Sequence, residues 1–325
     1  MTSTPPEPYY VEHDATLHQG HVLDVLPRLA AESVNCVVTS PPYYGLRDYG
    51  VDGQIGLEAS PGEYVEQMRA VFAAVRRVLR PDGTLWLDLG DTYDAGGNYA
   101  RRNPGTVKDG TGQAWNNSVG RTGGWPGAKQ LMGMPWRVAF ALQDDGWTLR
   151  NAIIWHKPNA MPESVTDRLS CRYEHVFLFS KSRRYWFDLD PIREARSEAT
   201  EARYRYAFKA NTNPASLTNH LADGGMMEKA NPAGRNPGDV WAIPTSPFPG
   251  AHFACMPPEL ARRCILAGSP QDGTVLDPFA GSGTTLMVAR QLMRRSVGIE
   301  LNPAYCDLVV SRLGQAPLDF TEAVS

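Results

Sequence analysis

The stretch Gly273-Thr274-Val275-Leu276-Asp277-Pro278-Phe279-Ala280-Gly281-Ser282-Gly283-Thr284-Thr285 decides the fold that we expect of this 325-residue chain. It reads as a short apolar strand that turns through glycines into an apolar-periodic helix, expected from Leu286 to Met293. Glycine lets a backbone approach a ligand closely, and a helix N-terminus presents free N–H groups to that ligand. The stretch therefore predicts an α/β fold with a ligand site at the carboxyl end of a strand.

The residues around these glycines indicate which ligand the loop takes. A phosphate loop is excluded because no lysine follows the glycines, where the Walker pattern needs Gly-Lys-Ser/Thr. A dinucleotide fits poorly, since Asp277 would repel a pyrophosphate, whereas an acid at this point suits a cationic ligand. The next predicted strand, Ser296 to Glu300, ends in a carboxylate placed like the ribose-hydroxyl acceptors of nucleoside-binding sheets. The alternative for Glu300 is a solvated strand end.

Another strand end carries Ser40-Pro41-Pro42-Tyr43. The strand is expected from Cys36 to Thr39, a β-branched run that stops at two prolines, which cannot donate to a ladder. The Ser40 hydroxyl and the Pro41 carbonyl offer two acceptors, and Tyr43 offers a flat aromatic face. These groups suit a planar base that bears an exocyclic amine. The alternative is a proline turn that only caps the strand.

Together the two motifs resemble a known enzyme family. Val37 to Tyr43 resembles the amine-methylating motif of DNA methyltransferases, and Asp277 to Thr285 resembles their S-adenosyl-L-methionine (AdoMet) loop. The order, with the catalytic motif first and the cofactor loop last, resembles the circularly permuted β group of DNA amino-methyltransferases. The similarity runs from roughly Gly20 to Leu313, with a gap at about 182–245.

The resemblance implies a Rossmann-like AdoMet-dependent methyltransferase fold of the α/β class. This fold has a mostly parallel seven-stranded sheet with helices on both faces, here circularly permuted and carrying an inserted target-recognition region. The expected parts are a catalytic half at 1–181 with a mobile glycine-rich loop at 95–133, a target-recognition region at 182–244, and an AdoMet-binding half at 245–325.

Other segments fit this organisation. Apolar residues at helical spacing predict a helix from Gly62 to Leu79 that ends at Arg80-Pro81-Asp82-Gly83 and is followed by a strand from Thr84 to Leu89. Further expected elements are a helix at Pro135 to Leu142, a strand within Trp147 to Asn159 that resembles the family's Ile-Ile-Trp-x-Lys-Pro-Asn, a Tyr-Glu edge strand within Arg172 to Lys181, and a helix at Pro258 to Leu266.

Two cofactor positions depend on the resemblance alone. His252 stands in a segment that resembles the family's His-x-Ala-x-x-Pro element. The family usually carries Gly-Asp, an acid that contacts the cofactor adenine, where this chain has Gly20-His21, and Asp24 is the candidate replacement. Asn35 also stands where an acid is common.

Local basic patches are the candidate DNA contacts, because a formal net charge of −3 gives no global attraction for nucleic acid. The glycine-rich loop contains Arg101, Arg102 and Arg121 among tryptophans, and a solvated insertion is its alternative. Arg203, Arg205 and Lys209 alternate with aromatic residues in the region assigned by position to target recognition. Lys157 and Asn159 follow a predicted strand end and are expected to line the base pocket or meet phosphate.

Several classes of protein are excluded or disfavoured. No apolar run approaches membrane length, and Met1 to Asp14 lacks the pattern of a signal peptide, so we expect a cytoplasmic protein. The five cysteines show no metal-type pairing, and we expect no metal site. Methylation at the ring carbon of cytosine uses a thiolate that in that family follows a proline, and the chain contains no Pro-Cys dipeptide. The cysteine pattern favours amine chemistry.

The sequence thus predicts a sequence-specific DNA methyltransferase that transfers the AdoMet methyl group to N4 of a flipped-out cytosine. Family members with Ser-Pro-Pro-Tyr mostly modify cytosine, and N6 of adenine is the alternative. A DNA-binding protein with a decayed catalytic domain and a protein or RNA amide methyltransferase are the more distant alternatives.

The expected partners are double-stranded DNA, a cognate restriction endonuclease and a second copy of the chain. The expected catalytic residues are Ser40, Pro41, Pro42 and Tyr43, the cofactor residues are Asp277, Pro278, Phe279, Ala280, Gly281, Ser282, Gly283, Thr284, Thr285, Glu300, Asn302, His252 and Asp24, and the DNA residues are Lys157, Asn159, Arg101, Arg102, Arg121, Arg203, Arg205 and Lys209.

Overall fold

The structure is a computed structural model that describes residues 7–12, 14–94, 129–199, 202, 231, 233–246 and 255–314. The chain divides into two compact units, one of Met1–Phe187 with Asp239–Ser325 and one of Asp188–Gly238. The second unit contains the 3-10 helix η2 (Asp190–Ile192) and an antiparallel bridge between Glu194 and Arg235. It falls within the region expected at 182–244, whose role in target recognition stays a prediction.

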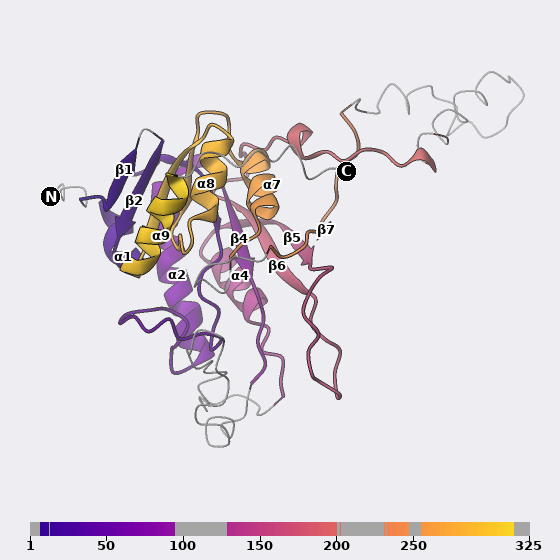
Figure 1. The fold of residues 1–325 in the computed structure, drawn as a ribbon, viewed down its shortest axis with the longest axis horizontal. Coiled ribbons are helices and arrows are strands. Elements are labelled where there is room, and N and C mark those ends of the chain that lie inside the picture. Colours follow the sequence, from indigo (N-terminus) through magenta and orange to yellow (C-terminus); the bar gives the residue numbers. More distant parts are fainter. Residues whose placement is uncertain are drawn as a thin grey trace, which may run out of the picture. The chain divides into compact units, whose positions relative to one another are not determined.

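The first unit is built on a sheet whose strand order is β1-β2-β9-β8-β3-β4-β6-β5-β7 (Figure 1). The strands are β1 (Tyr10–Glu12), β2 (Ala15–Gln19), β3 (Val34–Thr39), β4 (Leu79–Leu89), β5 (Thr148–His156), β6 (Tyr173–Ser180), β7 (Val240–Ala242), β8 (Thr274–Asp277) and β9 (Arg295–Glu300). All neighbours pair in parallel except β1 with β2 and β6 with both β4 and β5. The expected seven-stranded sheet is its centre, which β1 and β7 extend by one short strand at each edge.

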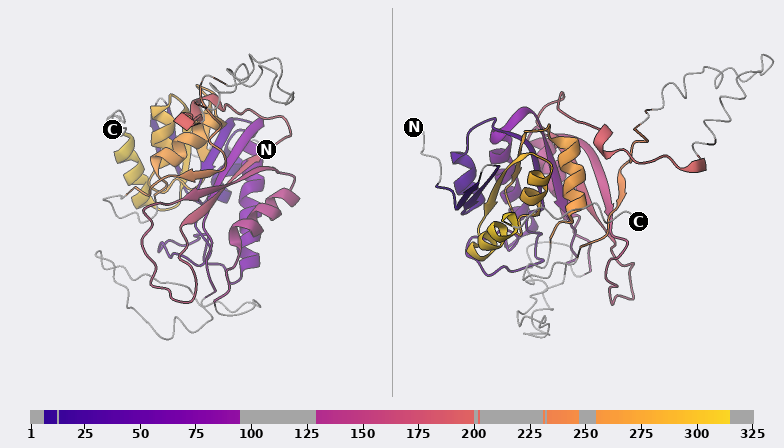
Figure 2. Two further views of the ribbon diagram at one scale, coloured as in Figure 1. Left: turned by 90° about the vertical axis from the view of Figure 1, so that its right-hand side faces the viewer. Right: turned by 45° about the horizontal axis from the view of Figure 1, so that its top comes forward.

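Helices cover both faces of this sheet (Figure 2). The helices of the first unit are α1 (Val22–Val25), the 3-10 helix η1 (Leu26–Arg28), α2 (Pro61–Val78), α4 (Met134–Asp144), α7 (Pro258–Gly268), α8 (Thr284–Gln291) and α9 (Pro303–Leu313). Helices α2 and α4 pack on one face, and α7, α8 and α9 pack on the other. The α/β fold class predicted from the sequence is confirmed.

This topology fixes where a ligand can bind. From β3 the chain passes through α2, on one face of the sheet, to β4. From β8 it passes through α8, on the opposite face, to β9, so β4 and β9 lie on opposite sides of the β3–β8 pair. Strands β3 and β8 are themselves parallel neighbours, with Cys36 opposite Val275 and Val37 opposite Leu276. Their carboxyl ends therefore form the topological switch point at which open α/β sheets bind ligands.

The long helix α2 illustrates how the core forms. Ser60 caps its N-terminus by accepting a hydrogen bond from the Glu63 N–H at 3.2 Å, and Pro61 occupies the first turn. One face of the helix is buried against the sheet; its fully buried members include Met68, Val71, Phe72 and Val75.

Two boundaries differ from the sequence prediction. The strand after α2 was expected to begin at Thr84, but β4 begins at Leu79, directly after α2. Val34 pairs with Leu79 and Cys36 with Thr84, so Arg80 to Gly83 belong to the strand but are looped out of its ladder with β3. Helix α8 begins at Thr284, earlier than expected, because Gly283 caps it with a positive φ of 77°.

In the described part of the chain, no helix is long and apolar enough to cross a membrane.

Candidate active site

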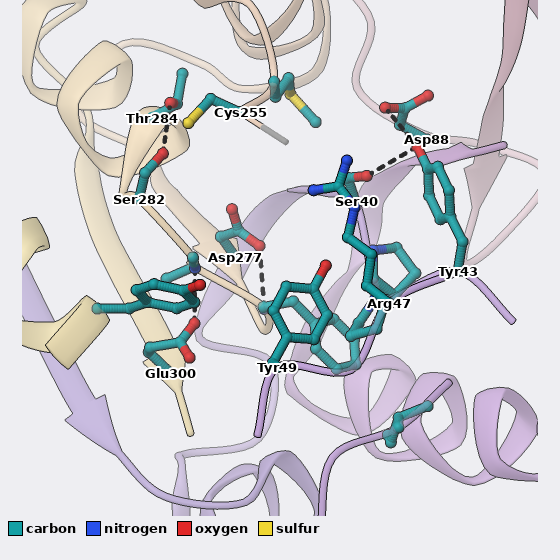
Figure 3. Close-up of a pocket in the computed structure, with 18 of the residues that line it drawn as sticks. Ser40, Tyr43, Arg47, Tyr49, Asp88, Cys255, Asp277, Ser282, Thr284 and Glu300 are labelled. Carbon is teal, nitrogen blue, oxygen red and sulfur yellow. Dashed lines mark hydrogen bonds between the residues drawn. The ribbon is translucent and has the colours of Figure 1, made fainter. Parts of the chain in front are cut away.

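A cavity of about 770 Å³ opens at the carboxyl ends of β3, β4, β8 and β9. Figure 3 shows Ser40 and Tyr43 on one side of this cavity and Ser282, Thr284 and Glu300 on the other. The predicted residues that line the cavity are Ser40, Pro41, Pro42, Tyr43, Lys157, Asn159, Asp277, Pro278, Phe279, Ala280, Gly281, Ser282, Thr284, Glu300 and Asn302. The fold thus brings the two motifs together although more than half of the chain separates them in sequence.

Some predicted residues lie elsewhere. Gly283 and Thr285 lie behind the lining, where the Thr285 hydroxyl donates to the Val38 carbonyl at 3.3 Å. Asp24 is exposed on α1 and does not line the cavity, so the structure does not support it as a replacement for the family's adenine-side acid. His21 does line the cavity, and its Nδ1 caps α1 by accepting from the Leu23 N–H at 3.3 Å. The predictions for His252, Arg101, Arg102, Arg121, Arg203, Arg205 and Lys209 lie outside the described residues.

The glycine loop is tied to the end of β9. The Gly281 N–H donates to Glu300 Oε2 at 2.8 Å, and the Asn302 N–H donates to Glu300 Oε1 at 2.8 Å. Burial raises the pKa of Glu300, although these backbone donors oppose the shift. From α9, Arg312 donates to the Ser282 carbonyl at 2.6 Å, which holds the far side of the loop. A carboxylate oriented in this way retains lone pairs for ribose hydroxyls.

Asp277 is the second carboxylate of this half of the cavity, and its side chain is almost fully buried. Its Oδ1 accepts hydrogen bonds from the Thr39 hydroxyl at 2.7 Å and from the Phe279 N–H at 3.1 Å. Burial outweighs these bonds and raises the pKa of Asp277 to about 6. A buried carboxylate with few compensating charges is suited to a cationic ligand, because the ligand's charge offsets the cost of ionisation.

The Ser-Pro-Pro-Tyr half of the cavity contains a chain of hydrogen bonds. The Ser40 hydroxyl donates to the Tyr43 hydroxyl at 3.2 Å, and the Tyr43 hydroxyl donates to Glu174 Oε2 at 2.9 Å. The Tyr64 hydroxyl donates to the Pro42 carbonyl at 2.9 Å and so fixes the proline segment from α2. The side chains of the motif are therefore held in place before any base enters.

Asp88 and Glu174 are acids of this cavity that the sequence reasoning missed. Asp88, on β4, is 3% exposed, and Tyr43 Oη lies 3.4 Å from its Oδ2. Its Oδ1 has no hydrogen-bond partner among the described residues. Burial, followed by the charge of Glu174, raises the pKa of Asp88 well above its usual range. An acid within the apolar run Leu87-Asp88-Leu89 was the available signal.

Lys157 and Asn159 both bind other residues of the protein, which their positions in the sequence did not indicate. The Lys157 ammonium pairs with Glu174, and the two side chains are 19% and 18% exposed. Asn159 Nδ2 donates to the Thr245 carbonyl at 2.9 Å, and its Oδ1 accepts from the Thr245 N–H at 2.8 Å. Asn159 thus fastens one segment of the cavity wall, and its contact with DNA stays a prediction.

Arg47, Tyr49 and Tyr305 also line the cavity and were not singled out from the sequence. The rings of Tyr49 and Tyr305 meet edge to face, with centroids 6.5 Å apart. They flank the part of the cavity where Glu300 and Asn302 lie, so this part combines aromatic surfaces with a carboxylate. That combination is suited to a nucleoside.

A doubly wound sheet with acids at the ends of two adjacent strands and Ser-Pro-Pro-Tyr at the end of a third is the arrangement expected of an AdoMet-dependent amino-methyltransferase. The chain belongs to the N6/N4 methyltransferase family, whose model, described as DNA methylase, matches residues 34–311. It is 45% identical over 312 residues to the type II methyltransferase M.XycI of Xanthomonas campestris pv. cyanopsidis, which covers 95% of this chain and 90% of the relative. The predictions of an AdoMet-dependent DNA amino-methyltransferase and of its cofactor are confirmed.

Solved structures show the same fold. The cytosine-N4-specific PvuII DNA methyltransferase superposes with a TM-score of 0.65 at 19% identity, over 97% of this chain and 92% of that chain. M1.HpyAVI, solved in complex with AdoMet, superposes with a TM-score of 0.52 at 16% identity, over 93% of this chain and 100% of that chain. At these identities the similarity extends to the fold, and the roles of individual residues depend on the geometry of the cavity.

Proposed function

We propose that the protein is a type II, sequence-specific DNA methyltransferase that modifies cytosine at N4 in double-stranded DNA. The observation that carries the proposal is the placement of Ser40 to Tyr43 at the end of β3, beside the acid-lined end of β8 and against the buried Asp88. The type II relative and the cytosine-N4-specific structural neighbour agree with it. A restriction endonuclease of the same specificity is the corresponding proposed partner.

The residues in the cofactor half of the cavity suit AdoMet in charge and in chemical type. Asp277 and Glu300 supply carboxylates for the ammonium and the ribose hydroxyls, Arg47 supplies a cation for the carboxylate, and Tyr49 and Tyr305 supply surfaces for the adenine. Bound AdoMet provides the methyl group as an electrophile on a sulfonium.

The other half of the cavity prepares the amine. The Ser40 hydroxyl and the Pro41 carbonyl accept its two hydrogens and draw the nitrogen lone pair out of conjugation with the ring. Tyr43 contributes an aromatic surface whose hydroxyl is fixed by Glu174. When the nitrogen forms its new bond to carbon it must lose one proton, and Asp88, which lines the cavity and whose Oδ1 has no hydrogen-bond partner among the described residues, is placed to accept that proton when it is ionised.

Methylation-aware sequencing of DNA from cells that express the gene tests this function. We expect modified cytosine within one short sequence, and we expect the modification to disappear with Ser40→Ala, which removes an acceptor from the amine site. Modified adenine would replace the proposal with the N6-adenine alternative. Absence of any modification by a folded protein that binds AdoMet would support the decayed-enzyme alternative.

A further inference from the structure

Lys157 presents a fixed ammonium to the cavity. It follows β5, forms an ion pair with Glu174, and lies with its Nζ 4.3 Å from the centroid of the Trp155 ring. The ring itself is fixed, because its Nε1–H donates to the Ile243 carbonyl at 2.8 Å. Both charged side chains are more than four-fifths buried, so this pair is not a solvent-screened surface bridge. The structure therefore holds one cation at a defined place in the wall.

That place is reached from Ser40 by consecutive short contacts. The Ser40 hydroxyl contacts the Tyr43 hydroxyl at 3.2 Å, and the Tyr43 hydroxyl contacts Glu174 Oε2 at 2.9 Å. The other oxygen of the same carboxylate, Oε1, holds Lys157. The wall is also tightly packed, because a Cβ at Gly90 would approach the Tyr43 ring to 2.6 Å. Ser40 and Lys157 are thus the two ends of a polar row that runs through Tyr43 and Glu174, with Asp88 next to Tyr43.

The polar edge of cytosine matches such a row. Its Watson–Crick edge presents the N4 amine as a donor, then N3 and O2 as two acceptors, whereas adenine presents the N6 amine, N1 and a C–H group. With the amine at Ser40, the two bases differ only at the far end of the edge. An ammonium has three donors, and Glu174 uses one of them. Carbonyl O2 can accept another, and a C–H group cannot.

We propose that Lys157 determines the choice of base by donating a hydrogen bond to O2 of the flipped cytosine, with Glu174 as the residue that positions it. This role rests on the proposed N4-cytosine function and names the contact that selects the base. Adenine in the same position leaves the ammonium facing a C–H group in a desolvated site, and such mismatches are the strongest source of rejection between substrates.

Lys157→Met tests the proposal, because methionine keeps the length of the side chain and removes its donors. Lys157→Arg keeps a donor, and Lys181→Met makes the same replacement at a lysine outside the cavity that pairs with Glu32. The substrates are two duplexes that contain the site methylated by the wild-type protein, one with cytosine and one with adenine at the target position. The measured quantity is the ratio of kcat/KM for the two. Thermal melting and AdoMet calorimetry check that each variant is folded.

We expect Lys157→Met to lower the cytosine-to-adenine ratio by roughly tenfold to a hundredfold, the usual effect of losing a specific hydrogen bond to a base. Lys157→Arg should retain most of the preference, and Lys181→Met should leave the ratio unchanged. The ratio is the relevant measure because the Lys157 charge also lowers the pKa of Asp88, so its loss slows transfer to both bases alike. If Lys157→Met fails to fold, the double variant with Glu174→Gln removes the unpaired carboxylate and is measured instead.

An unchanged ratio in a folded variant that binds AdoMet would overturn the role of Lys157 and leave the proposed function intact. An equal loss on both duplexes has the same meaning. If the wild-type protein modifies adenine, the proposed function fails, and the role of Lys157 fails with it.

Discussion

Replacing Asp277 with asparagine should change protein stability and AdoMet affinity in opposite directions. Burial raises the pKa of this carboxyl from its ordinary 3.8 to about 6. At about 1.4 kcal/mol per pKa unit, ionising it in the folded protein costs roughly 3 kcal/mol more than in the unfolded chain. Asparagine is nearly isosteric, can still accept from Thr39 and Phe279, and carries no charge. The ligand-free variant should therefore be more stable than the wild type at pH 8, by up to about 3 kcal/mol.

The difference in stability between Asp277→Asn and the wild type should depend on pH. Below about pH 4 the Asp277 carboxyl is protonated in both the folded and the unfolded protein, and its burial then costs no ionisation energy. As the pH rises through about 6, the free energy of unfolding falls, because the carboxyl ionises more readily in the unfolded chain than in the folded protein. The stability difference between Asp277→Asn and the wild type should accordingly be small near pH 4 and develop between pH 4 and about 6. Urea unfolding of both proteins without AdoMet, at a series of pH values, measures it.

AdoMet binding should respond in the other direction. Loss of a charge-assisted contact should weaken affinity by about 1.5–3 kcal/mol, or roughly tenfold or more, at pH 8. For the wild type, affinity should fall as the pH drops below about 6, because a proton competes with the ligand for Asp277, whereas the affinity of the variant should change little. Calorimetry that gives the two proteins equal affinity at pH 8 would refute the assignment of Asp277 to the cation of the cofactor. Unfolding that shows the variant less stable at that pH would refute the cost of ionisation that we assign to burial.

The remaining predictions concern the base and the DNA. Asp88→Asn should lower kcat by about a hundredfold or more in single-turnover assays while AdoMet affinity stays near that of the wild type, because only the acceptor of the amine proton is removed; unchanged kcat would exclude Asp88 as that acceptor. Tyr43→Ala should lower kcat/KM on the order of tenfold or more without loss of AdoMet binding, and full activity in a folded variant would remove its ring from the base site. In the segments assigned from sequence alone, Arg102→Ala should weaken binding to all duplexes and reduce the salt slope by roughly one, whereas Arg203→Ala should relax sequence preference. The reverse pattern would exchange the two assignments.

The ends of β3, β8 and β9 could be predicted because each is marked by local signals. Prolines stop β3 after Thr39, glycines turn the chain after β8, and Glu300 ends an apolar run. Parallel strands bring such ends to one edge of a sheet, so placing both motifs at strand ends was enough to put them on the ligand-binding edge. The start of α8 was less accurate because Gly283, in its left-handed conformation, caps the helix at a position that apolar periodicity does not reveal.

Asp88, Glu174 and the role of Lys157 could not be predicted in the same way. Each stands in or beside a strand whose apolar pattern explains most of its neighbours, and their meeting depends on the antiparallel insertion of β6 between β4 and β5. The sequence gives no measure of that non-local pairing. Lys157 was therefore expected to line the base pocket or meet phosphate, and its buried partner remained unknown. For the adenine side of the cofactor the structure gives a different placement from the sequence: α1 begins at Val22, which leaves Asp24 exposed and His21 at the cavity.

The most direct test of the central claim is the identity of the methylated nucleoside. The purified protein is incubated with unmethylated duplex DNA and AdoMet that carries a trideuterated methyl group, and the DNA is then digested to nucleosides and analysed by mass spectrometry. The placement of Ser40 to Tyr43 against Asp88 and Lys157 predicts trideuterated N4-methylcytosine, formed by the wild type and lost in Ser40→Ala. Trideuterated N6-methyladenine, or label in neither base, would contradict it.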